Sequence, residues 1–184
     1  MTENTRQINA ETPEVFLILN MQIGFMNNST QELPERIREA LSGNPSVSPI
    51  FTRFVSEPRD DGRLDPYLGM QESDPNTLIC PELIEFSGEK TMTTKNPMGL
   101  TLGVIEELRS LNSKTVYLCG VSTDTAIIAT CQILLDFDFN PVVLADYCAS
   151  ENGSIAHFAG LSLIARSIGM PRIHKGKYVP VRAN

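Results

Sequence analysis

The chain has 184 residues, of which 41% are hydrophobic, and it carries 22 acidic against 15 basic side chains for a formal net charge of -7. A single domain of this size buries roughly 70% of its unfolded surface, so it needs neither disulfides nor a structural metal to fold. The excess of acidic side chains does not favour binding to the negatively charged backbone of nucleic acid. Only two histidines are present, which argues against most histidine-based zinc and catalytic sites.

One domain is expected over residues 1–184, with residues 1–13 as a polar N-terminal tail that lacks the apolar core of a signal peptide. No apolar run approaches the 18 or so residues of a membrane span, so no membrane partner is expected. The four cysteines form no Cys-x-x-Cys pair, which favours reduced thiols and a cytoplasmic location. They are Cys80, Cys119, Cys131 and Cys148.

The apolar pattern alternates along the chain between strands and helices. Continuous apolar runs predict strands covered on both faces, and apolar stripes at helical spacing predict amphipathic helices. In chain order we expect a strand at 15–19, a helix at 33–41, a strand at 47–55, a long surface loop at 56–76, a helical turn at 81–86, a strand at 91–94, a helix at 102–111, a strand at 115–119, a helix at 126–135, a strand at 141–145, a helix at 154–168 and a strand at 171–174. This order predicts an α/β fold: a three-layer, doubly wound sheet of about six mostly parallel strands with helices on both faces.

In such a sheet, ligands bind beyond the carboxyl ends of the strands. The residues that leave the predicted strands are therefore the ones to inspect: Asn20, Lys95, the segment 120–126 and Asp146. Neither Gly-x-Gly-x-x-Gly nor a Gly-x-x-x-x-Gly-Lys-Ser/Thr loop occurs, so no nucleotide cofactor is expected.

Short motifs stand at these strand ends in a characteristic order. They are Leu-Asn-Met-Gln-Ile-Gly-Phe at 19–25, Lys95 followed by Gly-Leu-Thr-Leu at 99–102, Gly-Val-Ser-Thr-Asp-Thr-Ala at 120–126, and a strand that ends in Asp-Tyr-Cys-Ala-Ser at 146–150. From about residue 15 to about residue 173 the chain resembles the isochorismatase-like hydrolases, the cysteine hydrolase superfamily that includes nicotinamidases, N-carbamoylsarcosine amidases and isochorismatases. The resemblance implies a doubly wound parallel sheet, a small-molecule ligand and a homodimer or homotetramer.

The resemblance also places the family's Asp, Lys and Cys triad at Asn20, Lys95 and Ala126. In that triad a thiolate attacks the substrate carbon while the carboxylate carries the proton. Alanine has no nucleophile and asparagine no titratable proton, so the thiol mechanism cannot operate in this sequence. The related vinyl ether hydrolysis, which dispenses with the Cys, still needs the Asp. Cys131 lies about 140° around the helix from Ala126 and is no replacement.

Other candidate site residues also follow from the resemblance. Gln22 and Phe25 are expected to shape the substrate pocket, and Ser122 and Thr123 lie in a turn that relatives use for oxyanion-hole N–H groups. A non-proline cis peptide bond is expected near Val121-Ser122. Nicotinamidase-like relatives bind a divalent metal through Asp and His side chains after the second strand. No metal site is expected here, because this region offers three aspartates but no histidine, and Phe54 lies near the position where a histidine would be expected. The aspartates are Asp60, Asp61 and Asp65.

Two questions stay open at this level. Lys95 is either solvated at its strand end or, with the N–H groups of 122–126, holds an anionic ligand such as a carboxylate or phosphate. The incomplete triad has three explanations: a natural member that binds a small metabolite or serves as an oligomeric scaffold without catalysis, an active hydrolase changed at Asn20 and Ala126, or a different reaction in the same pocket. His157 is interpreted as a packed or capping residue rather than a ligand.

Overall fold

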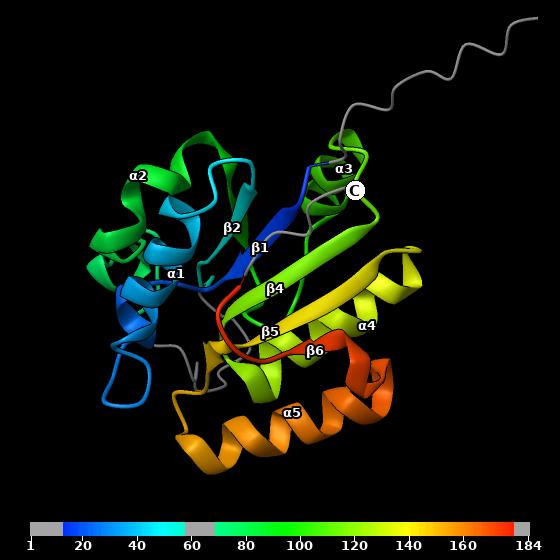
Figure 1. Ribbon diagram of the computed structural model, residues 1–184. Helices are drawn as coiled ribbons and strands as arrows, with labels where there is room; N and C mark the ends of the chain where they lie inside the picture. The colour runs from blue at the N-terminus through cyan, green and yellow to red at the C-terminus, as the bar shows by residue number, and fades with distance from the viewer. Residues whose placement is uncertain (1–12, 58–68, 179–184) are drawn as a thin grey trace, which may run out of the picture.

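The computed structural model describes residues 13–57 and 69–178. Six strands form one sheet in the order β3-β2-β1-β4-β5-β6, and every neighbouring pair is parallel (Figure 1). The order reverses between β1 and β4, which is where a doubly wound sheet binds its ligands. The predicted fold class is thereby confirmed. The strands are β1 Val15–Leu19, β2 Ser48–Phe54, β3 Thr91–Thr94, β4 Thr115–Val121, β5 Asn140–Ala149 and β6 Ile173–His174.

Helices cover both faces of this sheet (Figure 1). One apolar cluster joins the odd-numbered residues of β1 to α3, α4 and α5, and a second joins Phe16 and Ile18 to α1 and the segment before α2. Because β1 contributes to both clusters, all five of its residues are buried, as its continuous apolar run predicts. The α-helices are α1 Leu33–Ser42, α2 Ile84–Ser87, α3 Leu102–Ser110, α4 Ile128–Asp136 and α5 Ser154–Ile168.

Short helical turns complete the described chain. The 3-10 turns are Ile23–Phe25, Pro75–Thr77, Pro81–Leu83, Gly88–Lys90 and Met170–Arg172, and a π-helical turn, Thr123–Ile127, precedes α4. Much of the predicted surface loop at 56–76 lies outside the described residues. In the described part of the chain, no helix is both long and apolar enough to cross a membrane.

Two strands extend past their predicted ends. β4 continues through Val121 because Gly120, with φ 112°, brings its backbone against β1, and a Cβ there would lie 2.2 Å from the Leu19 carbonyl oxygen. β5 continues to Ala149 through a bulge, since its register against β4 shifts between the Val143 and Cys148 pairings. The exposed Asp146 lies in this bulge.

Candidate functional site

Asn20 lies at the switch point between β1 and β4, directly after the last residue of β1. It is 3% exposed and has a φ of 51°, in the left-handed region that asparagine tolerates better than most residues. The turn therefore holds its side chain at the carboxyl edge of the sheet, under the segment that follows β3.

The hydrogen bonds of Asn20 engage its whole carboxamide. Nδ2 donates to the carbonyl oxygens of Pro97, at 2.8 Å, and Val121, at 3.3 Å. Oδ1 accepts from the Thr52 hydroxyl at 3.3 Å, and the same hydroxyl accepts from the Asn20 backbone N–H. Two carbonyl oxygens thus face the amide nitrogen. A carboxylate in this place would set its own oxygen against both carbonyls, whereas an amide satisfies them.

Ala126 lies in the turn between β4 and α4. The peptide bond Val121-Ser122 is cis, which confirms the prediction. The Ser122 carbonyl then accepts from the N–H groups of Thr125 and Ile127, so the chain enters α4 through a π-helical turn. Ala126 is 2% exposed and belongs to the apolar cluster under α3, α4 and α5. The place that the resemblance assigns to the nucleophile holds a methyl group.

Thr123, in the same turn as Ala126, has a hydroxyl group with a basic partner. Its Oγ1 lies 2.8 Å from Nδ1 of His157 on α5, a pairing between residues 34 positions apart that the sequence analysis did not predict. Burial lowers the pKa of His157, while Asp146 and Asp124 act in the opposite direction. However, Thr123 is fully buried and its hydroxyl is occupied by the imidazole of His157. The pair fastens α5 to the turn, as expected for a packed histidine.

Lys95 follows β3 but points into solvent. Its side chain is 74% exposed and its Nζ lies 2.6 Å from Oε1 of Glu57, itself 60% exposed. Of the two interpretations of Lys95, the structure matches the solvated one. An anionic ligand held by Lys95 stays a prediction, and an exposed pair of this kind contributes little to stability.

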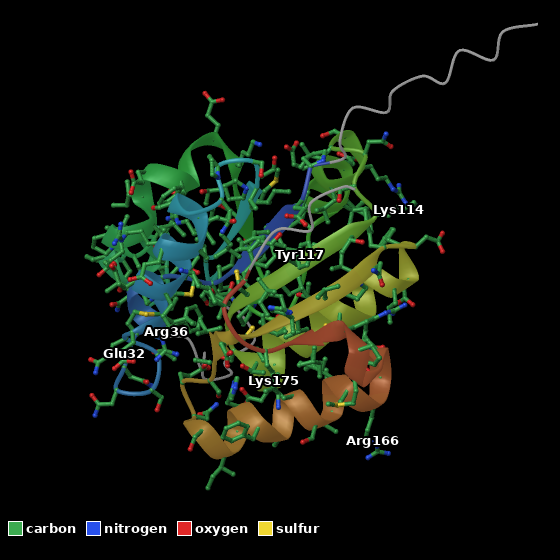
Figure 2. All side chains as sticks on the ribbon, in the orientation of Figure 1. Glu32, Arg36, Lys114, Tyr117, Arg166 and Lys175 are labelled. Atoms are coloured by element: carbon green, nitrogen blue, oxygen red, sulfur yellow. The ribbon has the colours of Figure 1, made fainter. Side chains whose placement is uncertain are left out.

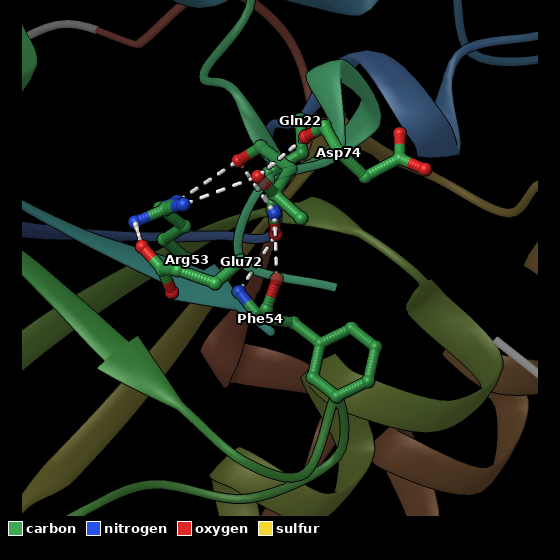
Figure 3. Close-up of polar contacts among 6 residues, drawn as sticks. Gln22, Arg53, Phe54, Glu72 and Asp74 are labelled. Carbon is green, nitrogen blue, oxygen red and sulfur yellow. Dashed lines mark hydrogen bonds and ion pairs between the residues drawn. The ribbon is translucent and has the colours of Figure 1, made fainter. Parts of the chain in front are cut away.

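Gln22 connects β1 to the end of β2 and to the loop before α2 (Figure 3). It is fully buried; Nε2 donates to the carbonyls of Phe54 and Thr77, at 2.8 and 2.9 Å, and Oε1 accepts from the Phe54 N–H at 2.7 Å. Arg53 also donates to the Thr77 carbonyl and pairs with Glu72. The Gln22 amide is therefore occupied by the protein itself, and its contact with a substrate stays a prediction.

Phe25 and Thr94 are buried near the same sheet edge. Phe25 packs against Phe54, with ring centroids 6.3 Å apart, so the two rings form an apolar wall. Thr94, the last residue of β3, is 2% exposed and its Oγ1 has no hydrogen-bond partner. Buried hydroxyls without partners are uncommon and often belong to sites that a ligand or water completes. No sequence pattern marks Thr94, because a threonine in a short strand carries no motif.

Metal-binding and thiol chemistry find little support in the described ranges. Residues 13–57 and 69–178 contain no group of three or more potential metal-ligating side chains, and the three aspartates of the predicted loop fall outside these ranges. All four cysteines are free and buried, and burial raises the pKa of Cys80 and Cys131 to about 12. Thiols of that kind are poor nucleophiles at neutral pH.

Comparison with known proteins identifies the family. A family model for the Isochorismatase domain matches residues 14–172, which include every candidate site residue. The chain belongs to the isochorismatase family. Isochorismatase domain-containing protein 2 of Xenopus laevis is 28% identical to it over 124 residues, which cover 66% of this chain and 58% of that relative. The match thus spans less than two thirds of the relative's length.

Solved structures of isochorismatase-like hydrolases share the fold. The pyrazinamidase of Pyrococcus horikoshii, solved in complex with zinc, superposes with a TM-score of 0.70 at 19% identity and covers 90% of this chain and 99% of its own. The nicotinamidase PncA from Bacillus subtilis gives a TM-score of 0.71 at 16% identity, covering 85% and 97%. At such identities the likeness establishes the fold alone.

Proposed function

We propose that this isochorismatase-family protein binds a small metabolite with an amide or related carbonyl group at the β1/β4 edge, and does not hydrolyse it by the thiol mechanism. The observation that carries this proposal is the hydrogen bonding of Asn20, whose Nδ2 donates to two backbone carbonyls. A residue with this many fitted partners supports a site adapted to asparagine.

The chemistry left in the site supports binding rather than thiol catalysis. Ala126 provides no attacking atom, and the Asn20 amide neither takes nor returns a proton at neutral pH. In the turn that holds Ala126, the Thr123 hydroxyl has a basic partner but is buried against it. Among the three explanations for the incomplete triad, these contacts favour a natural binding protein over an active hydrolase changed at two positions.

Three features are suited to recognise a small carbonyl compound. No side chain caps the turn after Ser122, and those of its N–H groups that are not bonded to the Ser122 carbonyl can donate to a carbonyl or carboxylate oxygen. The unpartnered hydroxyl of Thr94 offers one further hydrogen bond, and Phe25 against Phe54 provides an apolar wall. Because Lys95 points into solvent, an anionic ligand has less support than a neutral amide.

Ligand binding is tested by calorimetry and thermal shift with nicotinamide, benzamide and acetamide, alongside the corresponding carboxylic acids. Thr94→Val removes the hydroxyl and keeps the shape, and we expect it to weaken binding about tenfold, the value of one buried hydrogen bond. Thr93→Val is the control, since Thr93 is the exposed neighbour on the same strand. Equal binding by Thr94→Val and the unchanged chain would remove Thr94 from the site, and binding of none of the probes would contradict the proposal.

Catalysis is tested with the double variant Asn20→Asp, Ala126→Cys, with each single variant as its control. We expect a folded protein without amide, nitrile or isochorismate hydrolysis, because Lys95 faces solvent and Pro97 and Val121 present carbonyls to residue 20. Turnover by the double variant would instead support a hydrolase inactivated at these two positions. Turnover by the unchanged chain would require a different reaction at this site.

A further inference from the structure

A groove lies past the end of β5, between the start of α1 and the start of α5. Its volume is about 300 Å³, near the lower limit of the roughly 300 to 1,000 Å³ of small-molecule pockets. β4 stands between β5 and β1 in the sheet, and none of Asn20, Thr94 and Ala126 belongs to the described lining of the groove. The groove is therefore distinct from the candidate site at the β1/β4 edge.

Two side chains of opposite charge line the groove without pairing with each other. Arg36 lies beside Glu32 at the start of α1 and forms an ion pair with it at 2.7 Å (Figure 2). A guanidinium has five N–H groups, so Arg36 keeps donors beyond those that reach Glu32. Asp146, exposed in the bulge of β5, accepts from the Gly176 N–H, and no described residue forms an ion pair with it. The groove thus presents both a positive and a negative group to solvent.

Two further parts of the lining can donate to an anion. Ser150 is 1% exposed, and its Oγ accepts from the Asn152 N–H at 3.1 Å, which leaves the hydroxyl hydrogen for another acceptor. α5 begins at the groove with Gly153 as its N-cap, and no side chain caps it. The first N–H groups of a helix have no partner within the helix, and they favour a carboxylate oxygen. Together with Arg36, these donors are suited to hold a carboxylate.

His157 lines the same groove but adds no charge near neutral pH. Its Nδ1 lies 2.8 Å from Thr123 Oγ1, and burial lowers its pKa against the opposing effect of Asp146 and Asp124. The imidazole is therefore mainly neutral at about pH 7.5. In the described lining, the charged side chains at this pH are Arg36 and Asp146.

We propose that this groove binds a free α-amino acid with an apolar side chain. The ligand's carboxylate accepts from Arg36, Ser150 and the first N–H groups of α5, and its ammonium group pairs with Asp146. A ligand with a carboxylate alone would meet Asp146 with like charge, and an amine alone would meet Arg36 in the same way. The apolar side chain lies against Ala149 and Phe158, whose side chain is 64% exposed.

Calorimetry with the full chain at about pH 7.5 tests the class of ligand. The probes are the free amino acids leucine and phenylalanine, with phenylpropionate and phenylethylamine as matched compounds that lack the ammonium or the carboxylate. We expect both amino acids to bind. Each matched compound should bind at least about tenfold more weakly than phenylalanine, because it loses one hydrogen-bonded charge.

Two variants test the charged groups of the groove. Arg36→Gln and Asp146→Asn each remove one charge at an exposed position, and we expect each to weaken binding of both amino acids about tenfold or more. Arg38→Gln is the control on α1, since Arg38 pairs with Glu35 and does not line the groove. Asp136→Asn, at the exposed end of α4, is the control for the loss of an acidic side chain. Circular dichroism checks that each variant is folded.

The proposal is overturned if neither amino acid binds at up to about 10 mM, or if both groove variants bind as tightly as the unchanged chain. Equal binding of phenylalanine and either matched compound also overturns it, because one of the two charges would then be irrelevant. Loss of binding in Thr94→Val, with none in the groove variants, would place the amino acid at the Asn20 site instead. The amides that test the Asn20 site are different probes, so either proposal can fail without the other.

Discussion

Replacing Asn20 with Asp tests whether the site needs the amide nitrogen Nδ2 of residue 20. The change is nearly isosteric, but it removes both amide hydrogens that reach the Pro97 and Val121 carbonyls. The new carboxylate places an acceptor oxygen where the two carbonyl oxygens now have a donor. The residue at this position is only 3% exposed, so water does not supply a donor instead. The contact therefore changes from attraction to repulsion without any change in volume.

The expected loss of unfolding free energy is about 3 to 5 kcal/mol near neutral pH. Two lost hydrogen bonds contribute about 1 kcal/mol each, and leaving buried polar groups unpaired adds about 1 to 3 kcal/mol. This is a large fraction of the roughly 5 to 15 kcal/mol that holds a typical domain together.

The loss depends on pH in a defined direction. Burial and the two carbonyls raise the pKa of the introduced Asp above its ordinary value of about 3.9. The folded state therefore favours the protonated acid, which donates one hydrogen bond, and the deficit is small below the unfolded-state pKa. It grows as pH rises through the folded-state pKa and is complete above it.

Urea unfolding of Asn20→Asp and the unchanged chain at about pH 4 and about pH 8 measures this difference. Asn28→Asp, at an exposed position of the loop after β1, is the control for the added charge. A variant as stable as the parent at the higher pH would refute the reasoning, because the amide nitrogen would then not be needed between the two carbonyls.

Three further changes probe the surroundings of the site. Gln22→Leu leaves the Phe54 N–H and carbonyl without their partner, and we expect about 2 to 4 kcal/mol less stability in urea unfolding, against no change for the exposed Gln71→Leu. Gly160→Ala puts a Cβ 2.8 Å from the Asp124 backbone and should lower the unfolding free energy by about 1 to 3 kcal/mol. Its control, Gly103→Ala on α3, meets only ordinary contacts and should be neutral or stabilising. Equal shifts in the melting temperature of the two variants would contradict this. Burial and the neighbouring Glu14 raise the pKa of Tyr178, so its neutral form stabilises the fold below about pH 10 and this contribution disappears as pH rises through the raised pKa. Tyr178→Phe should therefore flatten the alkaline fall in thermal stability, and an unchanged profile would show that Tyr178 is not responsible.

Much of the fold follows from local pattern. Each apolar run became a strand because a strand between two helical layers has no polar face, as in Val15–Leu19. The cis bond at Val121-Ser122 followed from the family resemblance and is present. The local pattern did not reveal two features that depend on residues far apart in the sequence. The extension of β4 needs Gly120 against Leu19, and the bulge of β5 depends on its register against β4.

The candidate site was predictable in position but not in its contacts. Asn20 and Ala126 lie where the strand ends put them, because parallel strands end at one edge. Gln22 was expected to shape a pocket, yet its amide is used by Phe54 and Thr77, partners 32 and 55 positions away. The direction of Lys95 likewise depends on Glu57, which no motif marks.

The solvent-facing Lys95 and the amide of Asn20 belong to one arrangement, because Pro97 joins them. Its carbonyl accepts from Asn20 Nδ2 at 2.8 Å, which fixes the chain two residues after Lys95. To bring Lys95 inward against an Asp at position 20, the segment 95–97 must move and release that bond. Since residue 20 faces two carbonyls and Lys95 pairs with Glu57 in solvent, we expect the double variant Asn20→Asp, Ala126→Cys to keep the rate of Lys95 acetylation of the unchanged chain. The rate is measured by mass spectrometry, with the exposed Lys177 as the internal reference. A lowered rate would mean that the segment moves and brings Lys95 inward against the new carboxylate.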